Sequence, residues 1–99
     1  MGKLIRKDCI DRLAAYKTEK GSSLGITRLG IFGSVARDQH TEHSDLDVVV
    51  EMDNPSLRKM YELESNLCQM FGCKVDVVQM RPTLRPLLKQ YIQRDAIYV

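Results

Sequence analysis

What the sequence lacks excludes several classes of protein. It has no apolar run long enough to cross a bilayer, no secretory signal and no lipidation motif, so we expect a cytoplasmic protein that is not anchored in a membrane. It also lacks a strong charge imbalance, because its 15 lysines and arginines stand against 13 aspartates and glutamates, a formal net charge of +2. That excess is too small to indicate nucleic-acid binding by bulk electrostatics.

Two common kinds of nucleotide site are missing. The sequence contains neither a G-x-x-x-x-G-K-[ST] phosphate loop nor a G-x-G-x-x-G motif, which excludes P-loop and Rossmann-type nucleotide binding. The three cysteines, Cys9, Cys68 and Cys73, form no C-x-x-C pair. We therefore expect them to be reduced and structural rather than to bind zinc.

The length and the even composition favour one small domain. Ninety-nine residues fit a single domain, 1–99, with a modest core. There is no internal repeat and no low-complexity segment. A second domain that recognises a substrate does not fit within this length, so the sequence does not identify the acceptor of any reaction.

The most informative stretch runs from Gly33 to Asp47. The apolar run 29–32 before it predicts a buried strand, so Gly33 and Ser34 fall where that strand turns. Glycine allows a ligand to approach the backbone closely, and Ser34 is expected to cap a short helix whose free N–H groups face an anion such as phosphate. This part of the stretch favours a negatively charged ligand.

Carboxylates follow at strand spacing. Asp45 and Asp47 are two residues apart at the start of a β-branched run, which points both side chains to one face of a strand. Asp76 lies in a second apolar run, 74–78, and if the two strands are neighbours the three carboxylates converge. Oxygen ligands of this kind suit Mg²⁺. The alternative is a solvated strand end in which Asp76 pairs with Lys74.

The rest of the chain predicts an α/β (α+β) fold with a small mixed sheet and helices packed on it. The order of the strands in the sheet is left open. The first half is expected to form a helix over 3–20, a turn at 21–25, a strand over 26–32, a turn and short helix over 33–37, and an exposed loop at 38–43. A strand over 46–51 follows, and then a helix that ends at Gly72 and begins with Asn54 as its cap and Pro55 in its first turn. The chain ends with a strand over 74–79, a helix after Pro82 with Pro86 in its first turn, and a terminal segment, 96–99, that adds a short edge strand or docks on a partner. His40 and His43 lie in the exposed loop, so we do not expect them to bind a metal.

The order Gly-Ser, ten residues, Asp-x-Asp and a distant Asp in a second strand resembles the nucleotidyltransferase superfamily to which DNA polymerase beta belongs. Within it the chain is similar to the minimal nucleotidyltransferases. The resemblance implies a polymerase beta-like fold and transfer of a nucleoside monophosphate, AMP from ATP, to an acceptor hydroxyl with two Mg²⁺ ions. It further implies that Asp45 and Asp47 bind both ions, and that Asp76 completes the ion nearest the attacking hydroxyl and accepts its proton.

The resemblance also assigns roles around the phosphates. Gly33 and Ser34 are expected to hold the β- and γ-phosphates, and Arg37 either neutralises phosphate charge or pairs with a nearby acidic residue. Ser44 is expected to hold its turn or to contact a phosphate. Asp38 departs from the pattern, since many relatives have glycine there, but aspartate also adopts the left-handed turn conformation.

Minimal nucleotidyltransferases resemble the antitoxin of two-component pairs whose toxin is a helical HEPN-type ribonuclease. By that resemblance we expect a protein adenylyltransferase antitoxin that modifies a hydroxyl of its toxin. One alternative is a non-catalytic binding module that neutralises its partner by covering it. Another is transfer to a small molecule or to an RNA end. The sequence does not predict an oligomeric state.

Overall fold

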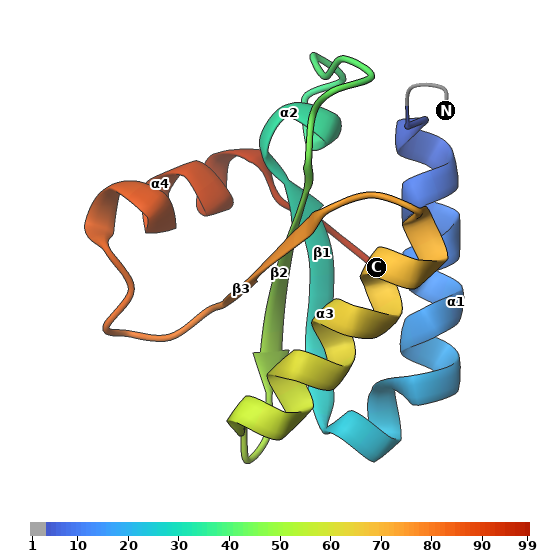
Figure 1. The fold of residues 1–99 in the computed structure, drawn as a ribbon. Coiled ribbons are helices and arrows are strands. Elements are labelled where there is room, and N and C mark those ends of the chain that lie inside the picture. Colours follow the sequence, from blue (N-terminus) through green and yellow to red (C-terminus); the bar gives the residue numbers. More distant parts are fainter. Residues whose placement is uncertain (1–3) are drawn as a thin grey trace.

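A four-stranded sheet forms the centre of the fold. The computed structural model describes residues 4–99, and the strands in this range are β1 (Ile26–Phe32), β2 (Leu46–Met52), β3 (Val75–Gln79) and β4 (Ile97–Tyr98). They lie in the order β3-β2-β1-β4. β1 pairs antiparallel with β2 and β4, whereas β3 runs parallel to β2. The predicted mixed sheet is therefore confirmed (Figure 1).

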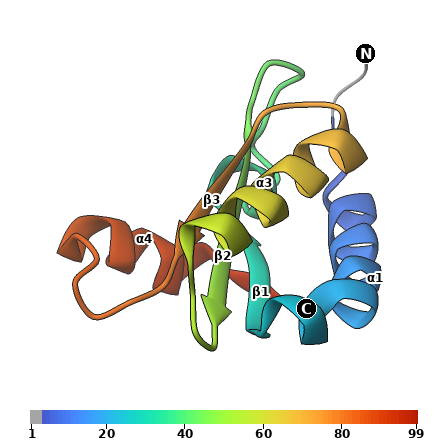
Figure 2. The ribbon, with the colours of Figure 1, turned by 60° about the horizontal axis from the view of Figure 1, so that its bottom comes forward.

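Helices cover the two faces of the sheet unequally. α1 (Arg6–Leu24) and α3 (Leu57–Phe71) lie side by side on one face, over the larger hydrophobic core (Figures 1 and 2). α4 (Pro86–Asp95) lies on the opposite face and buries only Ile92, which packs with Phe32 and Val49. The short helix α2 (Gly33–Ala36) follows β1 directly. No helix within residues 4–99 is long and apolar enough to cross a membrane. The α4 side of the sheet is thus the more open side.

α1 is longer at its C-terminal end than the sequence predicts. The expected turn at 21–25 was wrong, because the helix continues through Leu24, whose side chain is buried in the core. Gly25 ends the helix in the left-handed conformation, with φ of 71°, which glycine adopts at little cost. Burial of Leu24 explains the extra turn. The predicted start at Lys3 lies outside the described residues, and the helix begins at Arg6.

The start of α3 also differs from the prediction. Asn54 is not the cap, and Pro55 is not in the first turn. Ser56 caps the helix, and its Oγ accepts a hydrogen bond from the N–H of Lys59 at 3.1 Å. Asn54 instead takes a left-handed turn conformation with φ of 50°, which asparagine tolerates. The predicted end is confirmed, because Gly72 closes the helix with φ of 66°.

The C-terminal elements follow the prediction more closely. Pro86 is the first residue of α4, where its missing N–H is not needed; the helix begins there rather than just after Pro82. The predicted short edge strand forms β4, in which Tyr98 pairs with Gly30. A Cβ atom at Gly30 would lie 2.5 Å from the carbonyl oxygen of Ile97. Glycine at that position therefore allows β4 to approach β1.

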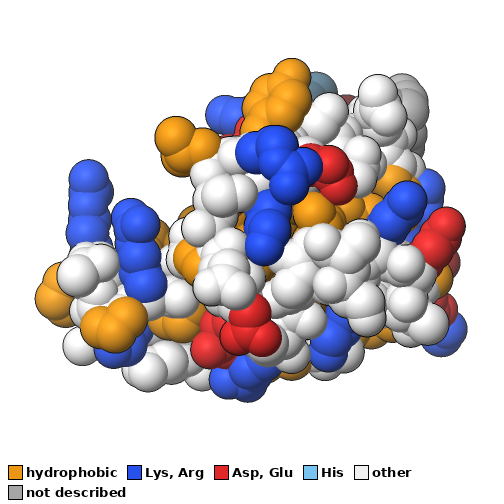
Figure 3. All heavy atoms as spheres, turned by 90° about the horizontal axis from the view of Figure 1, so that it is seen from below, with side chains coloured by type: hydrophobic (Ala, Val, Ile, Leu, Met, Phe, Trp, Pro, Cys, Tyr) orange, Lys and Arg blue, Asp and Glu red, His pale blue; other side chains and the backbone are white. Residues whose placement is uncertain are grey.

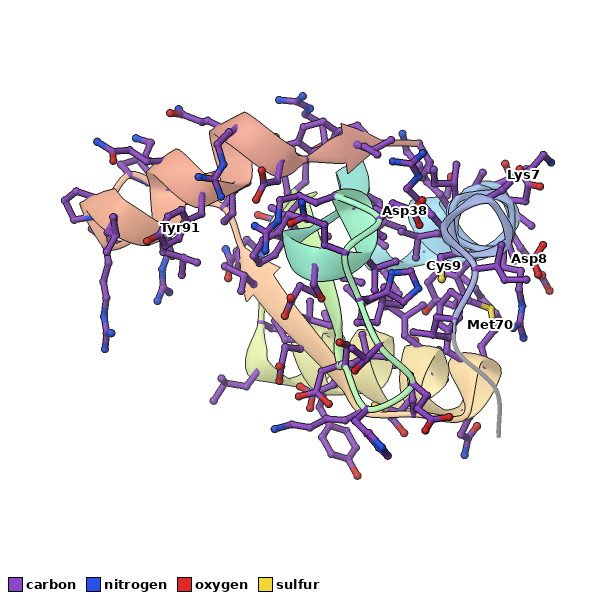
Figure 4. The ribbon with its side chains drawn as sticks, turned by 90° about the horizontal axis from the view of Figure 1, so that it is seen from above. Lys7, Asp8, Cys9, Asp38, Met70 and Tyr91 are labelled. Atoms are coloured by element: carbon purple, nitrogen blue, oxygen red, sulfur yellow. The ribbon has the colours of Figure 1, made fainter. Side chains whose placement is uncertain are left out.

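The three cysteines are not joined by disulfides. All three are free thiols, and none belongs to a metal-binding group within residues 4–99. Cys9 on α1 is buried in the core against which Met70 of α3 packs (Figure 4). Burial raises the pKa of the Cys9 thiol to about 11. A thiol with so high a pKa is a poor nucleophile and a poor metal ligand at neutral pH.

Candidate active site

The parallel pairing of β2 and β3 brings the predicted carboxylates together. Asp47 and Asp76 are directly paired residues in the two strands. Their side chains point to the α4 side, because the residues two further along, Val49 and Val78, belong to the small core beneath α4. Asp45 lies two residues before Asp47 and so continues the same side of β2.

The pKa of Asp47 shows that its carboxyl interacts with those of Asp45 and Asp76. The pKa of the Asp47 carboxyl is raised to about 6, first by burial and then by repulsion from Asp76 and Asp45, against the opposing effect of Arg37. Burial and like charges both disfavour the ionised carboxylate. The chain therefore concentrates negative charge around Asp47, and a bound divalent cation would reduce the repulsion between the carboxylates.

Lys74 is a weak partner for this charge. Its Nζ lies 3.9 Å from Asp45 Oδ2 and also 3.9 Å from Asp76 Oδ1, with an exposed side chain. Exposed ion pairs at this distance contribute little. The alternative pairing of Asp76 with Lys74 is thus present, but it is loose and shared. Within residues 4–99 no group of three acidic, histidine or cysteine side chains is placed so that it could hold a metal ion as it stands. Asp47 and Asp76 are nevertheless paired in neighbouring strands, and carboxylate oxygens are ligands that suit Mg²⁺.

Gly33 gives Asp47 its position. Its φ is 73°, and a Cβ atom added there would lie 2.3 Å from Asp47 Oδ2. Any side chain would therefore displace the carboxylate. The predicted capping role of Ser34 was wrong, since the cap position of α2 is Phe32 and no side chain caps the helix. Phe32 lies there because α2 begins directly at Gly33, with no intervening turn.

Arg37 forms an ion pair that joins α2 to α4. Its Nη1 donates a hydrogen bond to Asp95 Oδ2 at 2.8 Å. The Asp95 side chain is 4% exposed and also accepts from Arg94 Nε at 2.8 Å. The predicted pairing with an acidic residue is confirmed. Because the Arg37 guanidinium has five N–H donors, this bond leaves others free for a phosphate.

A cleft of about 640 Å³ lies between these elements. Gly33, Arg37 and Asp47 line it, together with Tyr91 and Arg94 of α4. Tyr91 lies on the exposed side of α4 (Figure 4), and the Arg94 guanidinium stands 5.1 Å from its ring centre. The position of Tyr91 in the cleft is not predictable from the sequence, because Tyr91 continues the apolar pattern of α4 and no local pattern places α4 beside Gly33.

In the loop after α2, the prediction for Ser44 is confirmed in part and the prediction of an exposed His40 is wrong. Ser44 holds its turn, because its Oγ accepts a hydrogen bond from the Thr41 N–H at 2.9 Å; its contact with a phosphate stays a prediction. His43 is exposed, as expected. His40 is buried and bonds through Nε2 to the Leu4 carbonyl. Its loop is thus fastened to the start of α1, a long-range contact that local polarity does not reveal.

Asp38 takes the conformation expected of the glycine it replaces. Its φ is 59°, so the turn survives as predicted. Figure 4 labels Asp38 beside α2. A left-handed conformation costs a non-glycine residue about 1 kcal/mol. We expect Asp38→Gly to raise the free energy of unfolding in urea by about 0.5–1 kcal/mol, whereas Asp38→Ala should lower it. Equal stability of the two variants would contradict this strain.

Comparisons with known proteins agree with this geometry. The family model described as nucleotidyltransferase domain matches residues 12–99. The protein adenylyltransferase MntA of Thermococcus cleftensis is 34% identical over 100 residues, all of both chains. A solved structure provisionally assigned as a minimal nucleotidyltransferase has a TM-score of 0.80 and 31% identity over 98% of each chain. A mutant toxin–antitoxin complex, MntA–HpeT, has a TM-score of 0.62 and 25% identity over 83% of this chain and 70% of that chain.

These matches span nearly the whole sequence and include the Gly33–Asp47 stretch and the strand that carries Asp76. The chain therefore belongs to the nucleotidyltransferase domain family, is one of its minimal members and is an enzyme of that family.

Proposed function

We propose that the chain transfers AMP from ATP to a hydroxyl group of a protein, in the cytoplasm where ATP is available. The observation that carries this proposal is the position of the carboxylates. Asp47 and Asp76 are paired in neighbouring strands, and Asp47 lies at the wall of a cleft that also exposes Arg37. The cleft can hold a nucleotide with its phosphates near Arg37 and its α-phosphorus near the carboxylates.

Asp45, Asp47 and Asp76 would hold Mg²⁺ ions. Divalent ions at such a site polarise the phosphate and stabilise the attacking and leaving oxygens. The raised pKa of Asp47 supports this role, because carboxylates that repel one another gain most from a bound cation.

The chain's own residues have separate tasks in the transfer. Arg37 donates hydrogen bonds to phosphate oxygens, while Asp95 fixes its orientation. Asp76 accepts the proton of the acceptor hydroxyl. The hydroxyl oxygen then forms a bond to the α-phosphorus, the bond from that phosphorus to the bridging oxygen breaks, and pyrophosphate leaves with the electron pair. The product is the AMP ester of the acceptor.

We propose a HEPN-type toxin as the acceptor protein, which makes the chain an antitoxin. The name of the Thermococcus cleftensis relative, a protein adenylyltransferase, supports a protein acceptor. The MntA–HpeT complex, described as a toxin–antitoxin, supports a toxin partner.

Tyr91 is proposed to stack on the adenine base. It lines the cleft with its ring partly exposed, and stacking of a base on an aromatic ring is worth about 1–3 kcal/mol. We expect Tyr91→Ala to raise the KM for ATP by about tenfold, with a smaller change in kcat. Tyr91→Phe keeps the ring and should bind ATP like the wild type. Equal loss in both variants would assign the effect to the hydroxyl instead.

Intact-mass analysis of a host lysate tests the proposed function. The lysate is incubated with ATP, Mg²⁺ and either the wild-type chain or Asp45→Ala/Asp47→Ala. We expect one protein to gain the mass of one or more AMP groups only with the wild-type chain. If no protein gains mass while the chain still captures a partner, the binding-module alternative replaces the enzyme.

A further inference from the structure

The outer edge of β3 has no partner within the fold. β3 is the first strand in the order β3-β2-β1-β4, so only one of its edges is paired. The Leu46 N–H bonds to the Lys74 carbonyl, and the Met80 N–H bonds to the Val50 carbonyl. In a parallel ladder the residues of a strand alternate between its two edges. The even-numbered residues of β3 therefore bond to β2.

The odd-numbered residues of β3 then point their N–H and C=O groups outward. These residues are Val75, which is only 1% exposed, and Val77 and Gln79, which are partly exposed; within residues 4–99 no hydrogen bond outside the ladder reaches them. The accessible part of the edge is therefore Val77 and Gln79. A row of free backbone groups is a template for another strand. Proteins often cover such an edge, but here it lies next to the catalytic carboxylates.

Asp76 is the second residue of this edge strand. Its side chain points to the α4 side, whereas its backbone bonds to β2. A segment that pairs with the free edge would place one residue opposite Asp76 with its side chain on the same face, about 5 Å away between Cβ atoms. A hydroxyl on that residue would meet the carboxylate that is proposed to accept its proton.

The surroundings of the edge favour a particular sequence of segment. Lys74 stands before β3 and Arg81 just after it, and both are exposed. Acidic residues at both ends of the segment would complement them. A hollow of about 380 Å³ lies at the far end of β3, lined by Leu57, Met60 and Gln79 among others. Leu57 is 91% exposed, so an apolar side chain on the segment would cover it.

Figure 3 shows this part of the surface from below. Lys and Arg side chains project from the region of α4 on the left, and hydrophobic side chains are exposed beside them.

The distance from Asp76 to the hollow sets the length of the segment. Gln79 is about 10 Å along the strand from Asp76, since each residue of a strand advances about 3.3 Å. A segment of about five residues therefore spans the distance from the carboxylate to the hollow.

We propose that the acceptor presents its hydroxyl on an extended segment that adds to the free edge of β3. This inference rests on the proposed AMP transfer and deepens it. The segment carries a Ser, Thr or Tyr opposite the Asp76 region, acidic residues at its ends and an apolar residue that enters the hollow beside Leu57. Backbone pairing provides the docking, and the side chains provide the selectivity.

Gln79→Pro tests the backbone contact. Proline removes the outward N–H of Gln79 but no hydrogen bond to β2, and such positions on edge strands tolerate proline. Gln79→Ala is the matched control, because it removes the side chain and keeps the N–H. The probe is a pool of synthetic peptides, each with one central hydroxyl residue, β-branched neighbours and acidic ends. With ATP and Mg²⁺, we expect kcat/KM for the pool to be at least about tenfold lower in Gln79→Pro than in Gln79→Ala, because Gln79→Ala removes only the side chain that lines the hollow and keeps the N–H.

Hydrogen exchange gives a second readout that does not depend on turnover. The amides of Val77 and Gln79, which are partly exposed, should exchange rapidly in the free chain and slowly with saturating peptide. ATP affinity and the melting temperature of Gln79→Pro should match those of Gln79→Ala, which excludes unfolding as the cause.

Three results would overturn this inference. Equal modification of the pool by Gln79→Pro and Gln79→Ala would show that the edge is not used. Peptide-induced protection of α4 amides instead of β3 amides would move the docking site. AMP transfer to a protein of the host lysate, with none to the peptides, would reject the extended segment but keep the proposed function. Absence of AMP on every peptide and protein would reject the proposed function itself.

Discussion

Asp47→Asn is expected to transfer AMP about 10³-fold more slowly than the wild-type chain and, at neutral pH, to be the more stable protein. The loss of activity follows from the loss of a charged ligand at the wall of the cleft. Asparagine keeps the shape of the side chain but not the negative charge that would hold a divalent ion. Transfer to the acceptor protein, followed by intact mass, measures the first effect.

The gain in stability follows from the raised pKa of Asp47. The pKa of the Asp47 carboxyl is about 6 in the folded chain, whereas the ordinary value for an aspartate, 3.8, applies to the unfolded chain. Folding therefore favours the protonated carboxyl. The stabilising contribution is complete below about pH 4 and is lost as the pH rises through about 6. After allowance for solvent screening, Asp47→Asn should gain about 1 kcal/mol in the free energy of unfolding at pH 7.5. The gain should vanish toward pH 4.

Asp53→Asn provides the control for both effects. Asp53 is the exposed residue just after the opposite end of β2. The same change of charge is therefore made beside the same strand but away from the cleft. We expect wild-type transfer and no pH-dependent gain in stability. If Asp53→Asn were stabilised as much as Asp47→Asn, net charge rather than the local cluster would be the cause.

The part of the site that lies in one short stretch was predictable from the sequence. Asp45 and Asp47 share a face because strands repeat every two residues, and a glycine after a buried strand marks a turn. Asp76 joins them only because β3 pairs parallel with β2. The apolar pattern predicts that strand, but the order of the strands was left open, because pairing between segments that are distant in the sequence leaves no local signal.

The part of the cleft that α4 lines was not predictable from the sequence, because it depends on where α4 packs on the sheet after the connection that follows β3. Tyr91 and Arg94 reach the cleft only because α4 crosses the open side of the sheet and Asp95 pairs with Arg37. Local pattern shows which side of α4 is apolar but not what that side covers. The buried position of His40 was missed for the same reason, since its partner is the distant Leu4 carbonyl.

Gly33→Ala is expected to lower both the rate of AMP transfer and the stability of the fold. Two costs coincide at this position, because φ is 73° and the new Cβ would lie 2.3 Å from Asp47 Oδ2. The carboxylate must move, and a displacement of about 1 Å at a reacting group lowers the rate by about 10²-fold. We expect kcat for AMP transfer to fall by about that factor, and the free energy of unfolding to fall by about 1–3 kcal/mol.

Gly21→Ala is the matched control for this change. Gly21 lies within α1, and a Cβ atom there would be 3.5 Å from Lys17 Cγ, an ordinary contact. Alanine is a better helix former than glycine by about 1 kcal/mol, so this variant should be as active as the wild type and slightly more stable. A loss of activity in Gly21→Ala equal to that in Gly33→Ala would show that the loss does not come from the contact with Asp47.

A double-mutant cycle separates the two costs of Gly33→Ala. Asp47→Asn keeps an atom where Oδ2 lies, so in that background Gly33→Ala should destabilise the fold by its full amount. Asp47→Ala removes the atom that the new methyl group would strike, and only the cost of the left-handed backbone, about 1 kcal/mol, should then remain. If Gly33→Ala were equally destabilising in both backgrounds, the backbone alone would demand glycine. A smaller cost beside Asp47→Ala would show that Gly33 is there to make room for the carboxylate.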